Sequence, residues 1–497
     1  MPTTKTITLI LTAGVLAGPA LAAVPPTPQD ITYPEVRFDP PEPTEFRLEI
    51  EGVPVYLAPS DELPLIDVRF TFKGGSYLDP DDQVGLASVT AGLMRTGGAG
   101  DLKPEALDEE LEFLAADLSV NAGDVFTSAS LNALSDNFDR SFDLFMDVVR
   151  RPMFDAARFD VLRNQVIEGM RQRNDDGLQV LLREGSFLVY GKDSVEARQP
   201  TLDSINSITE ADLRAFHDRV FHPGNLIIAV SGDFDREDMI DRLRALLAGW
   251  PRAEVSPAVP DNQHQPDPGV YYVDKDQPQG QVVISTRAIT RDDPDAIPMR
   301  VMNDILGGSG FTSRITNRVR TDEGLAYTAG SVVRSRVEYP GDFLAYYFSK
   351  VPTVALAGRT VYEEIDKIRD HEVSTDELET VKSNIIETFP RNFESKAGTL
   401  ALFVNDEFTH RPEGFWQSYR TKVDAVTPAD VQRVAREYLH PDRMAMLIVG
   451  PWQGIAAGNT ASEDDPDRVC TMDDIDGGKA TEIPMRDPLT LEFPSQD

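Results

Sequence analysis

The chain has 497 residues, of which 41% are hydrophobic, so it can bury more than one core. The single cysteine, Cys470, has no partner for a disulfide within the chain. With 48 Lys and Arg against 83 Asp and Glu, the formal net charge is -35, which repels phosphate backbones and excludes nucleic acid as an expected partner. The same charge serves either solubility or the attraction of cationic peptides.

The first 22 residues have the layout of a cleaved signal peptide. A lysine precedes an apolar stretch at residues 7–16, and the small residues Ala20 and Ala22 follow as an A-x-A cleavage site. About ten apolar residues are too few to span a bilayer, and no later segment is apolar enough, so we expect no stable membrane insertion. The sequence therefore predicts an exported protein, with the periplasm preferred and the extracellular medium as the alternative.

Each half of the chain opens with strands and continues with helices. Apolar residues predict adjacent strands at 46–56 and 66–72, and a similar pair at 270–273 and 281–285. Amphipathic spacing predicts helices that include residues 104–116, 140–150, 156–174, 297–306 and 353–368. This order predicts α+β lobes, each with a mostly antiparallel sheet and helices packed on it.

An internal repeat relates the two halves. ITEADLRAFHDRVFHPGNLIIAVSG at residues 208–232 matches VTPADVQRVAREYLHPDRMAMLIVG at residues 426–450, at a constant offset of 218 residues. In each copy a threonine N-cap, Thr209 or Thr427, starts a helix that ends at His-Pro, and a buried strand ending in glycine follows. The repeated unit predicts two homologous lobes.

Composition gives the boundaries of these lobes. Prolines are frequent in an N-terminal arm at 23–45 and in a linker at 251–269, and these segments delimit a first lobe at 46–250 and a second lobe at 270–455. The acidic remainder, residues 456–497, has little apolar periodicity, so we expect a loosely ordered tail.

Two segments carry a resemblance to a known family. VGLASVTAGLM lies at residues 84–94, and NDILGGSGFTSRITNRVRTDEGLAYTAGS lies at residues 303–331. Together with the repeat, they resemble the pitrilysin/insulinase zinc metallopeptidases, in the branch of the mitochondrial processing peptidase and its bacterial relatives, over residues 46–452. The resemblance implies that the two lobes are arranged as a clamshell.

The resemblance also implies a zinc motif that this sequence does not contain. In active members a helix after a Gly-Leu-Ala segment bears His-x-x-Glu-His, and a later helix supplies a third ligand, a glutamate. The matching residues here are Ser88, Ala91 and Gly92, none of which can bind zinc or activate water. The family spacing puts the third ligand at Gly169, one residue after Glu168. We therefore expect no metal and no other cofactor in this chain.

No replacement metal site is evident from the sequence. No two of the six histidines are four residues apart, as a helical zinc site requires. His217 and His222 are five apart, and we expect them to have packing and helix-end roles. The segment at 473–477 lacks the ligand spacing and the closing glutamate of a calcium loop.

The second lobe retains a different part of the family's machinery. The match at residues 303–331 puts the family's Arg/Tyr element on Arg320 and Tyr327, which the resemblance implies reach a zinc site in the opposing lobe or in a partner chain. There a tyrosine hydroxyl can donate to the oxyanion that forms when water adds to a peptide carbonyl, and arginine can hold substrate carbonyl oxygens. From spacing alone, the alternative is that Arg320 pairs with Asp322 while Tyr327 packs in a core.

The glycine segment before this pair fits a peptide contact better than a nucleotide site. Its glycines do not complete G-x-G-x-x-G or a Walker lysine, and Ser309 is no G-x-S-x-G nucleophile because Phe311 holds the last position. We expect a helix end followed by a peptide-facing loop in which four residues bind substrate. These residues are Gly307, Gly308, Ser309 and Gly310.

Lost zinc ligands together with a retained Arg/Tyr element predict the non-zinc subunit of an exported heterodimeric metallopeptidase. Such a chain is inactive alone, and its partner is a zinc-bearing paralogous subunit that cleaves peptides with the help of Arg320 and Tyr327. One alternative is a catalytically dead clamshell that binds peptides or acts as a scaffold. A second is an independent hydrolase, although no nucleophile, base and orienting residue can be assembled from recognisable motifs.

Overall fold

The computed structural model describes residues 38–459 and 468–495, which form two six-stranded sheets with helices packed on them. The predicted signal peptide and most of the proline-rich arm lie outside the described residues. The described residues from Pro40 onward form one compact unit. Within the described ranges, no helix combines the length and the apolar character that crossing a membrane requires.

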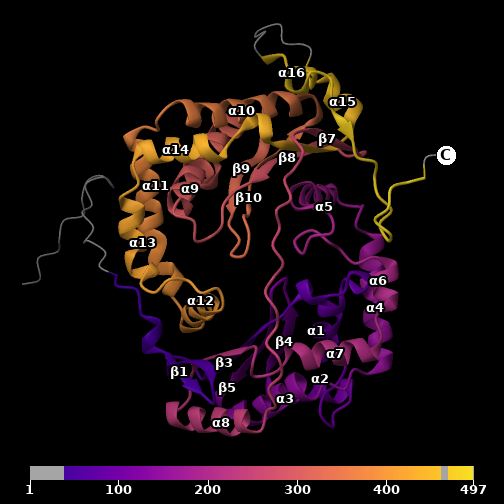
Figure 1. The fold of residues 1–497 in the computed structure, drawn as a ribbon, viewed down its shortest axis with the longest axis vertical. Helices are drawn as coiled ribbons and strands as arrows, with labels where there is room; N and C mark the ends of the chain where they lie inside the picture. The colour runs from indigo at the N-terminus through magenta and orange to yellow at the C-terminus, as the bar shows by residue number, and fades with distance from the viewer. Residues whose placement is uncertain (1–37, 460–467, 496–497) are drawn as a thin grey trace, which may run out of the picture. The chain divides into compact units, whose positions relative to one another are not determined.

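The sheet of the first lobe has the strand order β1-β2-β6-β3-β5-β4 (Figure 1). β2 and β6 run parallel, and the other neighbouring pairs are antiparallel. The strands are β1 (Arg47–Ile50), β2 (Val53–Pro59), β3 (Leu65–Lys73), β4 (Asp117–Ala122), β5 (Phe126–Leu134) and β6 (Leu226–Gly232). The helices are α1 (Leu86–Thr96), α2 (Pro104–Leu114), α3 (Phe138–Arg150), α4 (Ala156–Arg171), α5 (Gly177–Tyr190), α6 (Leu202–Ser207), α7 (Glu210–Val220) and α8 (Arg236–Ala248).

The sheet of the second lobe has the strand order β12-β7-β11-β8-β10-β9. The β12/β7 and β7/β11 pairs are parallel, and the remaining pairs are antiparallel. The strands are β7 (Gly269–Asp274), β8 (Gln279–Arg287), β9 (Ala326–Arg334), β10 (Asp342–Lys350), β11 (Ala445–Gly450) and β12 (Thr481–Glu482). The helices are α9 (Ala296–Asn303), α10 (Val354–Asp370), α11 (Thr375–Thr388), α12 (Lys396–Phe408), α13 (Phe415–Asp424), α14 (Pro428–Tyr438), α15 (Trp452–Ala457) and α16 (Asp473–Asp476).

The two lobes repeat one topology, which confirms the prediction of homologous α+β halves. The order β2-β6-β3-β5-β4 in the first sheet corresponds, strand for strand along the chain, to β7-β11-β8-β10-β9 in the second. The repeated helices α7 and α14 start with the same pair of hydrogen bonds. In α7 the Thr209 hydroxyl oxygen accepts from the Asp212 N–H, and the Asp212 carboxylate accepts from the Thr209 N–H. Thr427 and Asp430 form the same two bonds in α14. The capping box is therefore part of the repeat.

Each lobe contributes one helix to the sheet of the other (Figure 1). α5 follows the first-lobe strands in sequence, but its Val180 and Leu181 pack against Val283 and Leu447 of the second sheet. α12 belongs to the second lobe, and its buried residues Leu400, Phe403 and Val404 pack against Tyr56, Ile227 and Ala229 of the first sheet. Because both exchanged faces are apolar, separating the lobes exposes two hydrophobic surfaces.

The linker and the tail also join the lobes. Residues 251–268 have no helix or strand, and hydrogen bonds fix them to the first lobe, such as the Ser256 N–H to Asn225 Oδ1 at 2.9 Å. We expected loose order for the tail at residues 456–497, of which residues 460–467 and 496–497 lie outside the described ranges, but residues 468–495 contact both lobes. β12 extends the second sheet, and the Arg486 guanidinium reaches the buried carboxylate of Glu184 at 3.0 Å. An ion pair between residues so far apart in the sequence leaves no periodic pattern from which it could be predicted.

Candidate functional site

Helix α1 occupies the position where the resemblance implies a zinc motif. Asp79 accepts hydrogen bonds from the backbone N–H groups of Gly85 and Ala87, each at 2.9 Å, and so fixes the first turn of the helix. Gly85 has φ 107°, a conformation that glycine adopts readily. Burial raises the pKa of the Asp79 carboxyl to about 6.

The three motif positions on α1 offer no set of metal ligands. Ser88 is exposed, and Ala91 is 2% exposed within the core. A Cβ added at Gly92 would lie 3.2 Å from Cδ2 of Leu162 on α4, so the space beside Gly92 is already filled. At Gly92, α1 therefore packs against the aliphatic side chain of Leu162.

The predicted third-ligand position lies on α4. Glu168 is exposed and pairs with Arg171 at 2.9 Å, and Gly169 has no side chain. Among the described residues, no group of three or more His, Cys, Asp and Glu side chains is arranged to hold a metal ion. The residues at the four matched positions do not fit a zinc ion.

The two first-lobe histidines are packing residues, as predicted. His217 is buried, its Nε2 lies 2.9 Å from the Val149 carbonyl oxygen, and its ring stacks on that of Phe221 with centroids 5.2 Å apart. His222 is also buried, and its Nδ1 accepts from the Gly224 N–H at 3.0 Å. Burial lowers the pKa of His222.

The glycine segment of the second lobe ends a helix at Gly308, as expected, but the last turn is π-helical and a short 3₁₀ turn follows in place of an open loop. Asp304–Gly308 continues α9 as a π-helix, in which the Ser309 N–H donates to the Asp304 carbonyl at 3.1 Å. A second π-helix, Thr316–Asp322, follows a short 3₁₀ turn at Gly310–Thr312.

The four residues predicted to bind substrate lie in different environments. Gly307 is buried, and a Cβ there would lie 2.3 Å from the Ser331 nitrogen, so this glycine allows the π-helix to approach β9. Gly308 and Gly310 are exposed, and the Ser309 hydroxyl is buried without a hydrogen-bond partner in the described residues. Their contact with substrate stays a prediction.

Arg320 and Tyr327 come together with Phe311 in one surface cluster. The guanidinium carbon of Arg320 lies 4.7 Å from the ring centroid of Phe311 and 4.8 Å from that of Tyr327. Tyr327 is 80% exposed and Phe311 is 67% exposed. We call these three residues the Arg/Tyr cluster. Cation–π attraction from two rings holds the guanidinium group in place.

The structure does not show the alternative in which Arg320 pairs with Asp322 and Tyr327 packs in a core. Tyr327 lies on the surface and not in a core. Within the described ranges, Arg320 forms no ion pair with Asp322 or another carboxylate, and the Tyr327 hydroxyl has no hydrogen-bond partner. Both polar groups are therefore available to another molecule.

A β-bulge presents Tyr327 to solvent. β9 is an edge strand of the second sheet. Thr328 pairs with Phe348 of β10 and Ala326 pairs with Ser349, so Tyr327 is an extra residue without a partner in the ladder. A bulge of this kind bends the strand and redirects the side chain.

Polar contacts hold the segment that bears Arg320. Arg314 donates two hydrogen bonds to the Glu377 carboxylate on α11, at 2.7 and 3.0 Å. These bonds lower the pKa of Glu377 to about 2. The Thr316 hydroxyl donates to the Ala329 carbonyl of β9 at 2.9 Å. The second π-helix is thus fixed to both α11 and β9.

A large cavity in the second lobe was not predicted from the sequence. It has a volume of about 890 Å³ and lies among α9, β9, α11 and α13. Three aromatic side chains of α13 line it: Phe415, Trp416 and Tyr419. These three residues are one, three and four positions apart on the helix, and this spacing was the only sequence signal for the cavity wall. The same spacing also fits a helix face that packs in an ordinary core.

Comparisons with known proteins agree with this fold. Residues 59–184 match the family model described as Insulinase (Peptidase family M16), and residues 207–385 match the Peptidase M16 inactive domain. The non-peptidase homolog YmxG of Helicobacter pylori is 23% identical over 408 residues, covering 80% of this chain and 91% of that protein. A probable mitochondrial-processing peptidase subunit beta of Arabidopsis thaliana is 20% identical over 402 residues, covering 77% and 73%.

The fold is also that of solved structures. A peptidase M16 inactive domain from Pseudomonas fluorescens superposes with a TM-score of 0.73 at 24% identity, covering 82% of this chain and 97% of that one. One M16 model matches within the first lobe and the other matches mainly within the second. The chain therefore belongs to the insulinase family, peptidase family M16.

Proposed function

We propose that this protein is the non-zinc subunit of an exported heterodimeric metallopeptidase and completes the active site of a zinc-bearing partner. The observation that carries the proposal is the Arg/Tyr cluster, in which Tyr327 is 80% exposed and its hydroxyl has no hydrogen-bond partner in the described residues. A tyrosine with a packing role would bury its ring and satisfy its hydroxyl. The name of the Arabidopsis relative, a peptidase subunit, also supports a subunit role.

In this proposal the cluster stabilises negative charge on a reacting peptide. When water adds to the scissile carbonyl, the carbonyl oxygen becomes an oxyanion, and the Tyr327 O–H donates a hydrogen bond to it. That bond is stronger to the oxyanion than to the neutral carbonyl, so it lowers the barrier. Arg320 directs its N–H donors at carbonyl oxygens of the bound peptide, while the rings of Phe311 and Tyr327 restrict its orientation.

The partner supplies the metal and the water. α1 has the buried Ala91 at the position of the catalytic glutamate, so this chain provides neither the general base nor the histidine ligands. The signal-peptide layout of residues 1–22 supports export, with the periplasm as the compartment of the assembled pair. In the assembled pair, the zinc-bearing chain activates the water and this chain stabilises the resulting charge.

A reconstitution experiment tests the proposal. The mature protein is assayed against a mixed set of quenched fluorescent peptides, alone and with a His-x-x-Glu-His paralogue from the same genome. We expect the mixture to cleave the peptides well above the rate of the paralogue alone. The mature protein alone should be inactive, and chelation of zinc should abolish cleavage by the mixture. Cleavage by the mature protein alone, or an identical rate for the paralogue with and without it, would contradict the proposal.

A second candidate is a peptide-binding or scaffold protein without a catalytic role. The loss of all matched zinc ligands and the name of the Helicobacter pylori relative, a non-peptidase homolog, favour it. Complex formation without any gain in cleavage would identify this function. The two candidates therefore differ in whether a partner's activity depends on Arg320 and Tyr327.

A further inference from the structure

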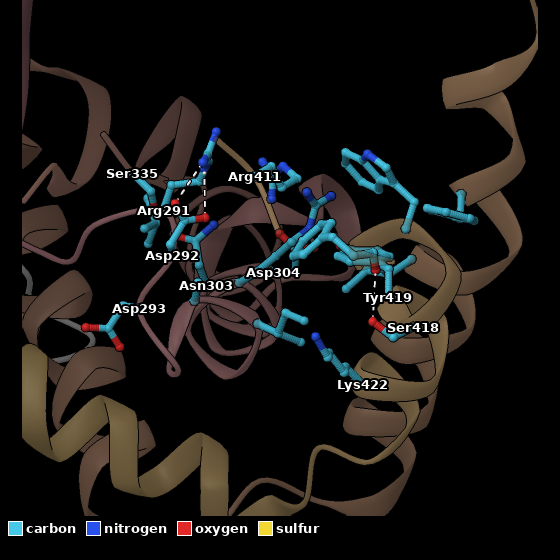
Figure 2. Close-up of a pocket in the computed structure, with 18 of the residues that line it drawn as sticks. Arg291, Asp292, Asp293, Asn303, Asp304, Ser335, Arg411, Ser418, Tyr419 and Lys422 are labelled. Atoms are coloured by element: carbon cyan, nitrogen blue, oxygen red, sulfur yellow. Dashed lines mark hydrogen bonds and ion pairs between the residues drawn. The ribbon is translucent and has the colours of Figure 1, made fainter. Parts of the chain in front are cut away.

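The second-lobe cavity is a second candidate site, and Gly308, one of the four residues predicted to bind substrate, is part of its lining. Its volume is about 890 Å³, and its walls come from α9 with the π-helix Asp304–Gly308, from β9, and from α11 and α13 (Figure 2). No residue of the Arg/Tyr cluster lines it. Pockets of roughly 300–1,000 Å³ hold small-molecule ligands. The cavity therefore has room for more than a single side chain.

The cavity lies at the second-lobe counterpart of the lost zinc motif. In chain order α9, α11 and α13 correspond to α1, α4 and α6 of the first lobe. A cavity of about 230 Å³ lies among those first-lobe helices, lined by Ser88 of α1, Leu162 of α4 and Ile205 of α6. The repeated fold thus leaves a recess at the same place in both lobes, and the larger one is in the second.

An aromatic wall forms one side of the cavity. The rings of Phe389 and Tyr419 are stacked, with centroids 5.3 Å apart and planes at 22°. Phe415 and Trp416 are half-buried, and their rings meet edge to face at 4.8 Å. The guanidinium carbon of Arg411 lies 4.1 Å from the Phe415 centroid and 5.1 Å from that of Trp416, so an aromatic or large aliphatic ligand group would meet this wall beside that cation.

Two of the basic side chains at the cavity are already neutralised. Arg411 pairs with Asp406 at 2.8 Å, and Arg291 pairs with Asp292 at 2.7 Å. Both guanidinium groups are largely buried in these pairs. A ligand would have to displace an existing carboxylate to bind either of them.

Two further cations at the cavity are available to a ligand. Lys422 forms no ion pair within the described residues, and its ammonium group lies 5.6 Å from the ring centroid of Phe415. Arg300 is 59% exposed and reaches Asp304 only at 3.8 Å. Figure 2 shows Lys422 and Tyr419, which are three residues apart on α13, on the side of the cavity opposite Asp293. The free positive charge therefore adjoins the aromatic wall.

The acidic side chains of the lining are less available. Asp292 is paired with Arg291, and Asp293 accepts a hydrogen bond from the Asp295 N–H at 2.8 Å. Burial raises the pKa of Asp304, which also faces Arg300. Glu413 is exposed at the edge. At Asp292 and Asp293 a ligand cation would compete with an internal arginine or N–H, whereas a ligand anion would find Lys422 unpaired in the described residues.

We propose that this cavity binds the carboxyl terminus of a peptide that ends in an aromatic or large aliphatic residue. The terminal carboxylate pairs with Lys422 and Arg300, and the last side chain lies against the aromatic wall of Phe415, Trp416 and Tyr419. The preceding residues of the peptide occupy the remaining volume. In a chain with a net charge of -35, such a site selects an anion by local contacts and not by the overall field.

A binding assay on the mature chain alone tests this proposal and needs no partner. The probe is Ala-Ala-Phe labelled with fluorescein at its amino end, used as the free acid and as the carboxyl-terminal amide, with Ala-Ala-Ala free acid as a third peptide. Fluorescence anisotropy gives Kd. We expect the Ala-Ala-Phe acid to bind about tenfold or more tightly than either of the other two. The amide loses the charge-assisted contact, and the Ala-Ala-Ala acid loses the aromatic contact.

Two matched variants locate the contact. Lys422→Gln, and independently Arg300→Gln, should weaken the acid and bring its Kd close to that of the amide, while leaving the amide unchanged. Lys192→Gln is the control, because Lys192 pairs with Asp193 and does not line the cavity. Equal binding of acid and amide, preference for the amide, or an unchanged Kd in Lys422→Gln would each overturn the proposal. Tyr327→Phe should leave this binding intact, which separates this site from the proposed function.

Discussion

The guanidinium carbon of Arg320 lies 4.8 Å from the ring centroid of Tyr327, so the two residues form one surface unit. Arg320 comes from a π-helix and Tyr327 from a bulge in an edge strand. Phe311 adds a second ring on the same cation. Two irregular backbone segments thus bring one hydroxyl-bearing ring and one guanidinium together on the surface, and the proposed stabilisation of an oxyanion depends on both.

Removing the Tyr327 hydroxyl should slow the chemical step of a reconstituted pair. For Tyr327→Phe we expect kcat to fall about 100-fold with KM nearly unchanged, because the hydrogen bond is made mainly in the transition state. Steady-state kinetics with the zinc-bearing partner in excess measure both constants. The exposed site makes a folding defect unexpected, and thermal unfolding of the variant checks this.

A second tyrosine of the same sheet is the control for this variant. Tyr271 lies on β7, and its hydroxyl donates to the Asp267 carbonyl at 3.1 Å. Tyr271→Phe also removes one hydroxyl but should leave kcat within about twofold of the original. An equal loss in both variants, or an unchanged kcat in Tyr327→Phe, contradicts the assigned role.

Phe311 should act on substrate binding through Arg320. Phe311→Ala removes one of two ring contacts, each worth about 0.5–1 kcal/mol at an exposed site, so Arg320 samples more orientations. We expect KM of the reconstituted pair to rise about two- to fivefold with a smaller change in kcat. Phe113→Ala, at an 87% exposed phenylalanine of α2, is the control. A KM effect of the same size in the control would show that surface hydrophobicity alone is responsible.

Local sequence signals predicted the elements whose ends are set by nearby residues. The N-caps Thr209 and Thr427 and the strands β6 and β11 follow from patterns within a dozen residues. The offset of 218 residues then extended each assignment to the other lobe. The lost zinc motif was placed on α1 by the family resemblance and not by a local pattern of this sequence.

Nonlocal contacts were not readable in this way. α5 and α12 each pack on the sheet of the other lobe, which is distant in sequence, so no local pattern indicates the contact. The bulge at Tyr327 depends on the register between β9 and β10, and no residue type specifies it. Spacing alone therefore favoured a packed Tyr327, and only the resemblance indicated an exposed one. The second-lobe cavity likewise arises from four elements that meet in space.

Restoring the zinc motif should fail at the buried position. Ala91→Glu puts a carboxylate where the side chain is 2% exposed, and we expect it to lower the free energy of unfolding by about 3 kcal/mol or more. Ser88→His, at an exposed position of the same helix, should change stability by less than about 0.5 kcal/mol. Urea unfolding measures both. A stable Ala91→Glu protein would show that the core around α1 still accommodates a catalytic carboxylate.

The Arg314–Glu377 pair should make the stability of the Arg320 segment depend on pH. Hydrogen bonds from Arg314 lower the pKa of Glu377 to about 2 in the folded protein, below its usual value of 4.5. A depressed carboxyl pKa contributes stability above the unfolded value and loses it as pH falls towards the folded one. Glu377→Gln should therefore be less stable than the original at pH 7, by about 1 kcal/mol after allowance for partial exposure, with the difference shrinking between pH 4.5 and 2.

Glu379 on the same helix provides the matched comparison for this pH effect. Its carboxylate pairs with Lys382 at 3.3 Å and is 58% exposed, so Glu379→Gln should change stability by less than about 0.5 kcal/mol at either pH. Urea unfolding of the three proteins at pH 7 and pH 3.5 gives the differences directly. Because Arg314 lies six residues before Arg320, Glu377→Gln should also raise KM of the reconstituted pair. A pH-independent stability difference would mean that packing around α11, and not the ion pair, holds the segment in place.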